Sequence, residues 1–202
     1  MEKILIVIDM QNDFIDGALG SPAAQAIVPY VCEKIKNWDS KFILYTFDCH
    51  NPFSYVMSAE GKSVPAHCML DTKGYMLNDD IAEAFVDYTT ANIPHGVVCE
   101  IEKDTFGSLE ELPRQIEALN LQNPFEIHIC GLCTDICVIS NALILRAAFP
   151  MANIIVDAAG CAGTSKENHQ AALQVMKANC ITVINDDEGE VKCLLTNKSL
   201  IS

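Results

Sequence analysis

The chain is poor in basic residues, and this excludes several kinds of partner. It has 13 lysine and arginine residues against 27 aspartate and glutamate residues, which gives a formal charge of −14. Such a charge disfavours nucleic acid and anionic membranes as partners, because both repel an acidic surface. No apolar run approaches the about 18 residues of a membrane span, so none is expected. Residues 1–10 lack the positive region and the small-residue cleavage site of a signal peptide, and we therefore expect a cytoplasmic protein.

Repeats, low-complexity tracts and proline-, glycine- or serine-rich linkers are also missing. With 202 residues, half of them hydrophobic, the chain fits one globular domain that buries roughly 70% of its extended-chain surface. We expect that domain over residues 1–185 and a C-terminal tail over residues 186–202. No G-x-G-x-x-G pattern follows the first predicted strand, which argues against a dinucleotide-binding domain.

Ten cysteines are present, but a secreted disulfide framework is not indicated. Such frameworks are usually shorter and rich in loops, whereas these cysteines lie mostly inside apolar runs. We therefore expect reduced, mostly buried thiols. A zinc cluster of Cys130, Cys133 and Cys137 is disfavoured, since a structural zinc site usually gathers four cysteine or histidine ligands.

Short β-rich runs alternate with amphipathic stretches, which is typical of an α/β protein with a parallel sheet. The β-rich runs are apolar throughout, as expected of strands covered on both faces. The sequence therefore predicts a single-domain, three-layer α/β/α fold around a mainly parallel six-stranded sheet. Strands are expected at residues 3–8, 42–47, 97–101, 125–130, 153–157 and 181–184, and helices at residues 23–38, 80–88, 109–118, 135–148 and 166–178.

The segment from Gly131 to Val138 is typical of a strand end, a tight turn and a helix start. It places Cys137 in the first turn of the helix, with Thr134 or Asp135 as the N-cap. Partial positive charge at a helix N-terminus favours a thiolate, and free backbone N–H groups there can hold an oxyanion. On this segment alone Cys137 is either a nucleophile or a buried structural cysteine, because a free cysteine also behaves as a small hydrophobe.

Polar residues follow the other predicted strands. Asp9 closes the first strand and Lys103 follows the third, while Asp48 closes the second. In an open parallel sheet, ligands bind beyond the carboxyl ends of the strands, so this coincidence favours a catalytic Cys137. Asp9 is then a candidate general base, and Lys103 a cation that keeps Asp9 ionised. Taken in isolation, a turn-capping Asp9 and a solvated Lys103 are the alternatives.

The long segment over residues 48–77 contains a candidate metal site. In an extended chain, residues two apart face the same side, so Asp48 and His50 can converge on one ion. His67 can return from the loop as a third ligand, and Glu60 can bind directly or through water. One carboxylate, two imidazoles and open positions suit one divalent transition metal, with zinc preferred over iron or manganese. Polar loop residues that only form turns are the alternative.

Four motifs together resemble the isochorismatase-like cysteine hydrolases and, among them, the nicotinamidases (pyrazinamidases). They are IDMQNDF at residues 8–14, D-x-H at residues 48–50 with PAHC at residues 65–68, the segment from Lys103 to Ser108, and GLCTDICV at residues 131–138. The motifs occur in the family's order, and the resemblance covers roughly residues 3–184. It implies the isochorismatase-like hydrolase fold.

The resemblance assigns roles to residues already singled out. It implies a catalytic triad of Asp9, Lys103 and Cys137. It also implies metal ligands in the second strand and the following loop, with a fourth ligand position that some members use: Asp48, His50, His67 and, at that fourth position, Glu60.

Further roles are implied around the substrate. A non-proline cis peptide at Leu132–Cys133 would turn the Cys133 N–H toward the Cys137 N–H, and the pair would form an oxyanion hole. Phe14 would pack against the substrate ring. Val64 departs from many nicotinamidases, which have an aromatic residue there to stack on the pyridine. Many nicotinamidases also have a second histidine soon after D-x-H, and Val56 lies near that position. The metal prediction therefore depends on Glu60 as the replacement ligand.

The resemblance implies hydrolysis of nicotinamide to nicotinate and ammonia through a thioester on Cys137, in NAD salvage. Val64 keeps open another amidohydrolase of the superfamily, acting on a carbamoyl or ureido compound. A non-catalytic protein with a reversibly oxidised thiol is a third alternative, although it would need neither Asp9 nor Lys103. An isochorismatase proper is disfavoured because that reaction needs no nucleophilic cysteine. We expect a small-molecule amide as substrate and, since family members are often dimers or tetramers, a homo-oligomer.

Overall fold

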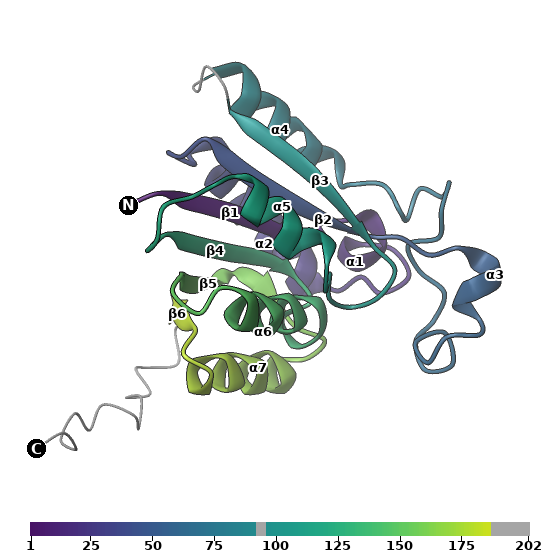
Figure 1. The fold of residues 1–202 in the computed structure, drawn as a ribbon. Helices are drawn as coiled ribbons and strands as arrows, with labels where there is room; N and C mark the ends of the chain where they lie inside the picture. Colours follow the sequence, from purple (N-terminus) through teal and green to yellow (C-terminus); the bar gives the residue numbers. More distant parts are fainter. Residues whose placement is uncertain (92–95, 187–202) are drawn as a thin grey trace, which may run out of the picture.

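A parallel β-sheet forms the centre of the computed structural model, which describes residues 1–91 and 96–186 (Figure 1). Its six strands have the order β3-β2-β1-β4-β5-β6, and every neighbouring pair is parallel. The predicted three-layer α/β/α fold is therefore confirmed. The strands are β1 (Lys3–Ile8), β2 (Phe42–Asp48), β3 (Val97–Lys103), β4 (Glu126–Leu132), β5 (Asn153–Ala162) and β6 (Thr182–Ile184).

Helices cover both faces of the sheet. On one face α2 (Pro22–Lys36) packs against α4 (Asp79–Ala91), and on the other lie α5 (Glu111–Ala118), α6 (Ile139–Ala148) and α7 (Lys166–Ala178) (Figure 1). Right-handed crossovers explain this division. The connections that lead from β1 outward to β3 run over one face, and those that lead from β4 outward to β6 run over the other.

The central strand β1 is the most deeply buried part of the sheet. Its five apolar residues from Ile4 to Ile8 are each at most 1% exposed. Burial of one such aliphatic side chain contributes about 1.5–3 kcal/mol to folding. The strand therefore holds the residue that follows it, Asp9, in a fixed place.

The strand order reverses between β1 and β4, and this is where a ligand crevice is expected in an open parallel sheet. The two strands approach closely at Gly131. A Cβ atom there would lie 2.1 Å from the carbonyl oxygen of Ile8, and the residue has a φ of +126°. Only glycine fits both conditions. A glycine at this position therefore lets β4 lie directly against β1 beneath the crevice.

Some element boundaries differ from the prediction. The helix expected over residues 135–148 starts as a π-helical turn, η1 (Thr134–Val138), before α6 begins. The strand expected over residues 153–157 continues to Ala162, because β4 and β5 resume pairing beyond an irregularity at residues 129–131. Two one-turn helices, α1 (Asn12–Ile15) and α3 (Pro52–Tyr55), lie where the sequence predicts none.

The cysteines are free thiols in the part of the chain that the structure describes, as predicted, and six of the nine found there are buried. Within residues 1–91 and 96–186 no helix has the length and apolarity needed to cross a bilayer. The predicted tail lies, except for Asp186, outside the described residues, so the domain boundary at residue 185 stays a prediction.

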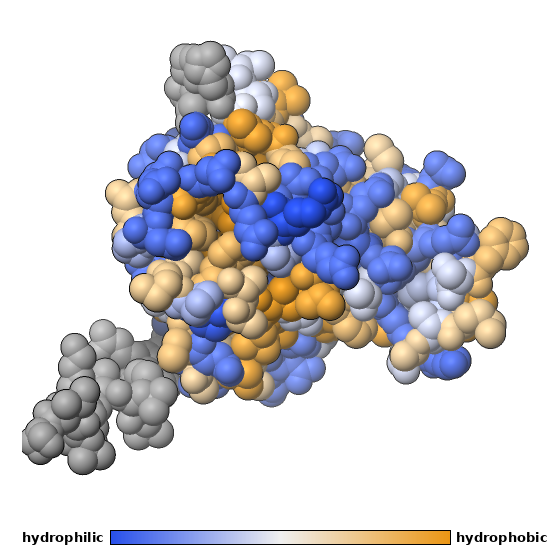
Figure 2. All heavy atoms as spheres, viewed as in Figure 1, coloured by the Kyte–Doolittle hydropathy of each residue, from blue (hydrophilic) through white to orange (hydrophobic). Residues whose placement is uncertain are grey.

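The surface is mixed in character. Figure 2 shows hydrophilic side chains over α5 and a hydrophobic area over α6. The short α3 stands away from the sheet (Figure 1). Its Phe53 is 87% exposed, and Met57, just after the helix, is 74% exposed. Val56, between them in sequence, is 61% exposed, so these apolar residues form a small exposed group at the end of α3.

Candidate active site

An acid, an amine and a thiol meet at the carboxyl ends of β1, β3 and β4. Lys103 Nζ lies 2.7 Å from Asp9 Oδ2 and 3.7 Å from Cys137 Sγ. All three residues are buried, at 0% exposure for Asp9, 6% for Lys103 and 2% for Cys137. The structure thus brings together the three residues that the sequence predicts as a triad.

Asp9 is held by the neighbouring strand as well as by Lys103. The Thr46 hydroxyl donates to Asp9 Oδ1 at 2.5 Å, and the Asp9 N–H donates to the backbone oxygen of Thr46 at 3.2 Å. Asp9 has a φ of +47°, in the left-handed region that few residues adopt. Burial raises the pKa of Asp9 above its ordinary value, although the Lys103 charge opposes this. A buried carboxylate with a raised pKa is suited to accept a proton.

Cys137 lies in the π-helical turn and faces this carboxylate. Its backbone oxygen accepts from the Asn141 side chain at 2.8 Å. Burial, together with the charges of Asp9 and Asp48, raises the pKa of the thiol well above its ordinary value despite Lys103. Burial and two carboxylates thus work against the thiolate that a helix terminus favours. Loss of the Cys137 proton is then helped by a base.

The expected N-caps are wrong. Cys133, with extended backbone, precedes η1, and its side chain makes no capping hydrogen bond. Asp135 instead accepts the Thr164 N–H at 2.8 Å and the Thr164 hydroxyl at 2.5 Å, while Thr134 Oγ1 lies 2.8 Å from His169 Nδ1. These contacts join the turn that bears Cys137 to the loop after β5 and to α7, since a π-helical turn presents its side chains differently from a regular helix start.

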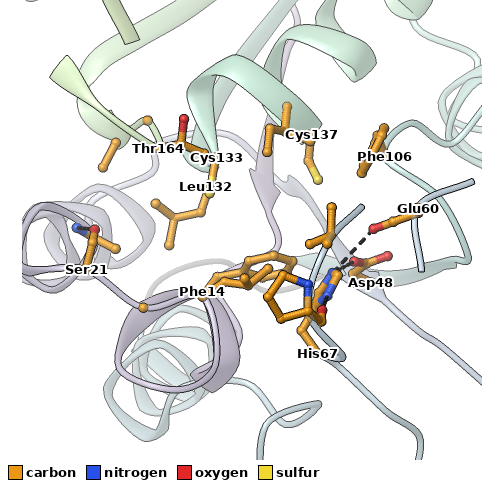
Figure 3. Close-up of a pocket in the computed structure, with 18 of the residues that line it drawn as sticks. Phe14, Ser21, Asp48, Glu60, His67, Phe106, Leu132, Cys133, Cys137 and Thr164 are labelled. Atoms are coloured by element: carbon orange, nitrogen blue, oxygen red, sulfur yellow. Dashed lines mark hydrogen bonds and ion pairs between the residues drawn. The ribbon is translucent and has the colours of Figure 1, made fainter. Parts of the chain in front are cut away.

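A cavity of about 360 Å³ opens beside the sulfur of Cys137 (Figure 3). This volume is near the lower end for small-molecule sites, which span roughly 300–1,000 Å³. Phe14, Val64, Leu132 and Cys133 line it, so the predicted substrate-binding positions share one cavity with the thiol. The Leu132–Cys133 peptide bond is cis.

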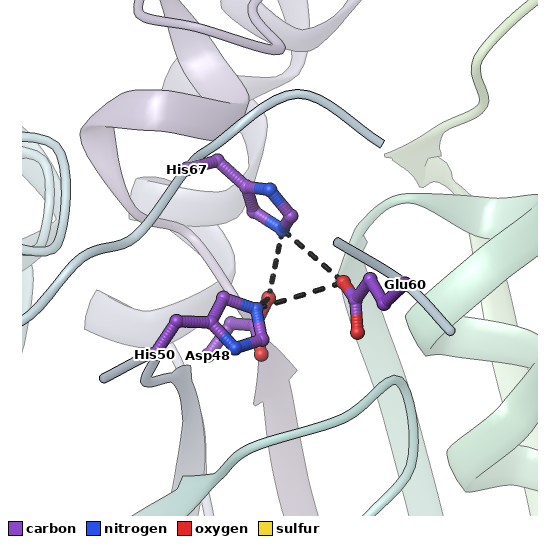
Figure 4. Close-up of side chains that lie close together, drawn as sticks. All are labelled: Asp48, His50, Glu60 and His67. Atoms are coloured by element: carbon purple, nitrogen blue, oxygen red, sulfur yellow. Dashed lines mark hydrogen bonds and ion pairs between the residues drawn. The ribbon is translucent and has the colours of Figure 1, made fainter. Parts of the chain in front are cut away.

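Four potential metal ligands converge at one side of this cavity (Figure 4). Asp48 Oδ2 lies 3.1 Å from Nε2 of both His50 and His67. Glu60 Oε1 lies 3.5 Å from the first of these nitrogens and 3.4 Å from the second. One ligand atom from each residue falls within 4.8 Å of all the others. The four predicted ligand residues therefore form one buried group.

The chemistry of this group fits a divalent cation. Asp48 Oδ1 and Glu60 Oε1 are buried without a hydrogen bond. His67 Nδ1 lies 2.7 Å from the carbonyl oxygen of Pro65, which can only accept. The proton is therefore on Nδ1, and in the neutral ring Nε2 directs a lone pair at the two carboxylates.

The two carboxylates also act on the protonation of the imidazoles. Burial by itself lowers their pKa values. The nearby Asp48 and Glu60 carboxylates nevertheless raise the pKa of His50 to about 9 and that of His67 to about 10. Two negative charges thus need positive charge between them, and a bound cation would supply it.

Two positioning residues were missed in the sequence. The buried side-chain amide of Gln11 accepts from the Asp48 N–H and donates to the Asp48 carbonyl, both at 2.8 Å, as a neighbouring strand would. The Tyr55 hydroxyl lies 3.2 Å from His67 Nδ1, and its ring packs on that of His50 at 4.5 Å. Gln11 lies inside the motif at residues 8–14, which was a signal, whereas nothing local marks Tyr55.

The fold and this site define a three-layer α/β protein in which an aspartate and a lysine contact a cysteine that lines a cavity, an arrangement suited to a hydrolase. Residues 3–188 match the isochorismatase domain model, and the chain belongs to that family of hydrolases.

Relatives and solved structures agree with this assignment. The chain is 29% identical to an uncharacterised isochorismatase family protein PncA of Bacillus subtilis, with 86% of this chain and 93% of the relative covered. It also resembles the crystal structure of nicotinamidase PncA from Bacillus subtilis, at TM-score 0.73 and 26% identity over 91% of this chain and 99% of that one. The zinc complex of pyrazinamidase from Pyrococcus horikoshii is similar at TM-score 0.71 and 25% identity, over 91% and 99% of the two chains.

Proposed function

We propose that this protein is a metal-assisted cysteine amidohydrolase that converts nicotinamide to nicotinate and ammonia through a thioester. The observation that carries the proposal is the position of Lys103 Nζ, 2.7 Å from Asp9 Oδ2 and 3.7 Å from Cys137 Sγ, beside a cavity of about 360 Å³. The similarity to a nicotinamidase and a pyrazinamidase supports the choice of substrate.

In the first half-reaction Asp9 accepts the proton of the Cys137 thiol as the sulfur attacks the amide carbon. The N–H groups of Cys133 and Cys137 stabilise the tetrahedral oxyanion, and one such donor lowers the barrier by about 3–4 kcal/mol. Protonated Asp9 then gives its proton to the leaving nitrogen as the C–N bond breaks. Ammonia departs and the acyl group remains on the sulfur.

In the second half-reaction Asp9 accepts a proton from water, and the water oxygen attacks the thioester carbon. The C–S bond breaks, the acid forms, and the Cys137 sulfur recovers its proton from Asp9. Lys103 keeps the carboxylate charged between proton transfers, because its ammonium is buried beside it.

The metal would be held by Asp48, His50, Glu60 and His67. A divalent transition ion there, zinc in preference to iron or manganese, would supply a Lewis acid for the substrate. Gln11 and Tyr55 hold the ligands in place through the backbone of Asp48 and the imidazole of His67.

Ammonia release from a panel of nicotinamide, pyrazinamide and a ureido compound tests the proposal. Cys137→Ala is expected to abolish release from the preferred amide while the far-ultraviolet circular dichroism spectrum is unchanged. Cys32→Ala, at a buried cysteine of α2 that does not line the cavity, is the matched control and should retain activity. Near-normal turnover by Cys137→Ala would refute the nucleophile. Release from the ureido compound alone would instead favour the carbamoyl or ureido amidohydrolase.

A further inference from the structure

We propose that the cavity selects neutral carboxamides whose acyl group is apolar and need not be a flat ring, and that Val64 sets this breadth. The inference rests on the proposed amidohydrolase function and concerns which amides the site accepts. Three features of the cavity carry it, namely the shape of its lining, the fixed position of Val64 and the charge around it.

The exposed surface of the lining is mostly apolar. Besides the thiols, the apolar side chains include Leu19, Val64, Leu132 and Ile136, and the phenyl rings come from Phe14 and Phe106. A slot between two parallel rings admits only planar groups. A branched side chain such as that of Val64 leaves room for tetrahedral carbons, because it does not cover a face of the substrate uniformly.

The wall that bears Val64 is fixed in position. The Val64 N–H donates to the backbone oxygen of Glu60 at 2.8 Å. Its carbonyl oxygen accepts from the Tyr55 hydroxyl at 3.1 Å, and Tyr55 itself is only 4% exposed. The backbone at this position is therefore held by hydrogen bonds on both of its polar groups. The size of the side chain at position 64 determines how much of the cavity is free.

The charge around the cavity disfavours an anionic substrate. Asp48 and Glu60 contribute to the lining, and no lysine or arginine does so among the described residues. The nearby Lys103 ammonium is already 2.7 Å from Asp9 and 3.3 Å from Asp48. The two carboxylates would also neutralise a divalent ion bound between them. The His67 imidazole in the lining already faces Asp48 at 3.1 Å and Glu60 at 3.4 Å. A substrate carboxylate would thus be buried without a counter-charge of its own, which is costly.

Binding to the Cys137→Ala variant, measured by calorimetry, tests the proposal without turnover. The probes are cyclohexanecarboxamide, nicotinamide and the anion N-carbamoylglycine. We expect the two neutral amides to bind within about threefold of each other and the anion to bind at least about tenfold more weakly, since small differences in fit or one unpaired polar group give such factors.

The substitution Val64→Trp in the same background should weaken cyclohexanecarboxamide at least about tenfold more than nicotinamide, because a ring at this position would flatten the cavity. Val64→Leu should give a smaller change in the same direction and serves if the larger side chain prevents folding. Val175→Trp, at a valine of α7 that is 45% exposed, is the matched control and should leave all three affinities unchanged.

The proposal is overturned if nicotinamide binds more than tenfold better than cyclohexanecarboxamide, if the anion binds best, if no neutral amide binds, or if the position-64 variants change both amides equally. Failure of the proposed function has a separate signature. In that case the wild-type protein releases no ammonia from any neutral amide, whatever the binding ratios of the Cys137→Ala variant.

Discussion

Two buried aspartate–lysine pairs in this molecule have the same chemistry and different surroundings. Asp157 of β5 is 2.6 Å from Lys34 of α2, and it also accepts from the Tyr30 hydroxyl at 3.0 Å and the Asn185 amide at 2.9 Å. Both of its carboxylate oxygens are hydrogen-bonded. Although burial raises its pKa, these donors, Lys34 first, lower the pKa of Asp157 below its ordinary value.

Asp9 is the contrasting case. Its Oδ1 accepts from Thr46, but the contact of Oδ2 with Lys103 is an ion pair without hydrogen-bond geometry. Burial therefore dominates and raises its pKa. The comparison teaches that a buried carboxylate becomes structural when hydrogen-bond donors occupy both of its oxygens, and stays able to take a proton when one oxygen is left to face a thiol and an amine.

The substitution Asp9→Asn gives the largest expected effect on this comparison. It removes the proton acceptor but keeps the shape, so the maximal rate of ammonia release should fall by about 10³-fold, within the usual range for a general base. Steady-state kinetics on protein with an unchanged circular dichroism spectrum measures it. A variant that retains activity within tenfold of wild type would show that Asp9, like Asp157, is only structural.

The mirror substitution, Asp157→Asn, should act on stability and not on turnover. It leaves the Lys34 ammonium, whose side chain is 16% exposed, without its charge partner, and we expect the free energy of unfolding to fall by about 3 kcal/mol. Urea denaturation measures the loss, and activity per folded molecule should be unchanged. Lys36→Ala, which breaks the exposed pair with Asp87, should change the free energy of unfolding far less, because solvent screens that pair.

Most of the fold could be predicted from the sequence because its signals are local. The apolar run of β1 and the periodic pattern of α7 have their predicted bounds. The extension of β5 to Ala162 could not be predicted, since it depends on renewed pairing with β4 beyond Gly131. The π-helical turn at Cys137 was likewise invisible, because a five-residue turn and the first turn of a helix have the same hydrophobic pattern.

The sequence predicted the candidate site to the extent that single polar side chains follow the ends of neighbouring strands. The register that pairs Asp48 with Lys103 explains why the second and third strands deliver their charges to one place. The thiol's raised pKa was not predictable, since it depends on how deeply Cys137 is buried and on two carboxylates from other strands. Tyr55 was missed because it acts across a loop, through His67 and the carbonyl of Val64.

Metal removal should have a smaller effect than these substitutions. It should act on the site beside Asp9 and Lys103 and leave the Asp157–Lys34 pair unaffected. If the group around Glu60 holds a divalent ion at about 100 times its dissociation constant, chelation should lower the stability of the folded protein by about 2.7 kcal/mol. The melting temperature before and after chelation, with metal analysis, measures this. Glu60→Gln should reduce the shift, whereas Asp157→Asn should leave its size unchanged. An absent shift together with no bound metal would contradict the metal site.

The smallest expected effect is a difference in the sign of the pH dependence. The folded-state pKa of Asp157 lies below its unfolded value, so its contribution to stability is present above the unfolded pKa of about 4 and is lost as the pH falls through the folded pKa. The stability gap between wild type and Asp157→Asn should therefore shrink on acidification.

For Asp9 the folded pKa is raised, so ionisation works against folding. The stability of the wild type relative to Asp9→Asn should therefore decrease as the pH rises above about 4. Urea unfolding of both variants and wild type between acidic and neutral pH measures the two slopes, and slopes of the same sign would show that the two carboxylates are not held in different ways.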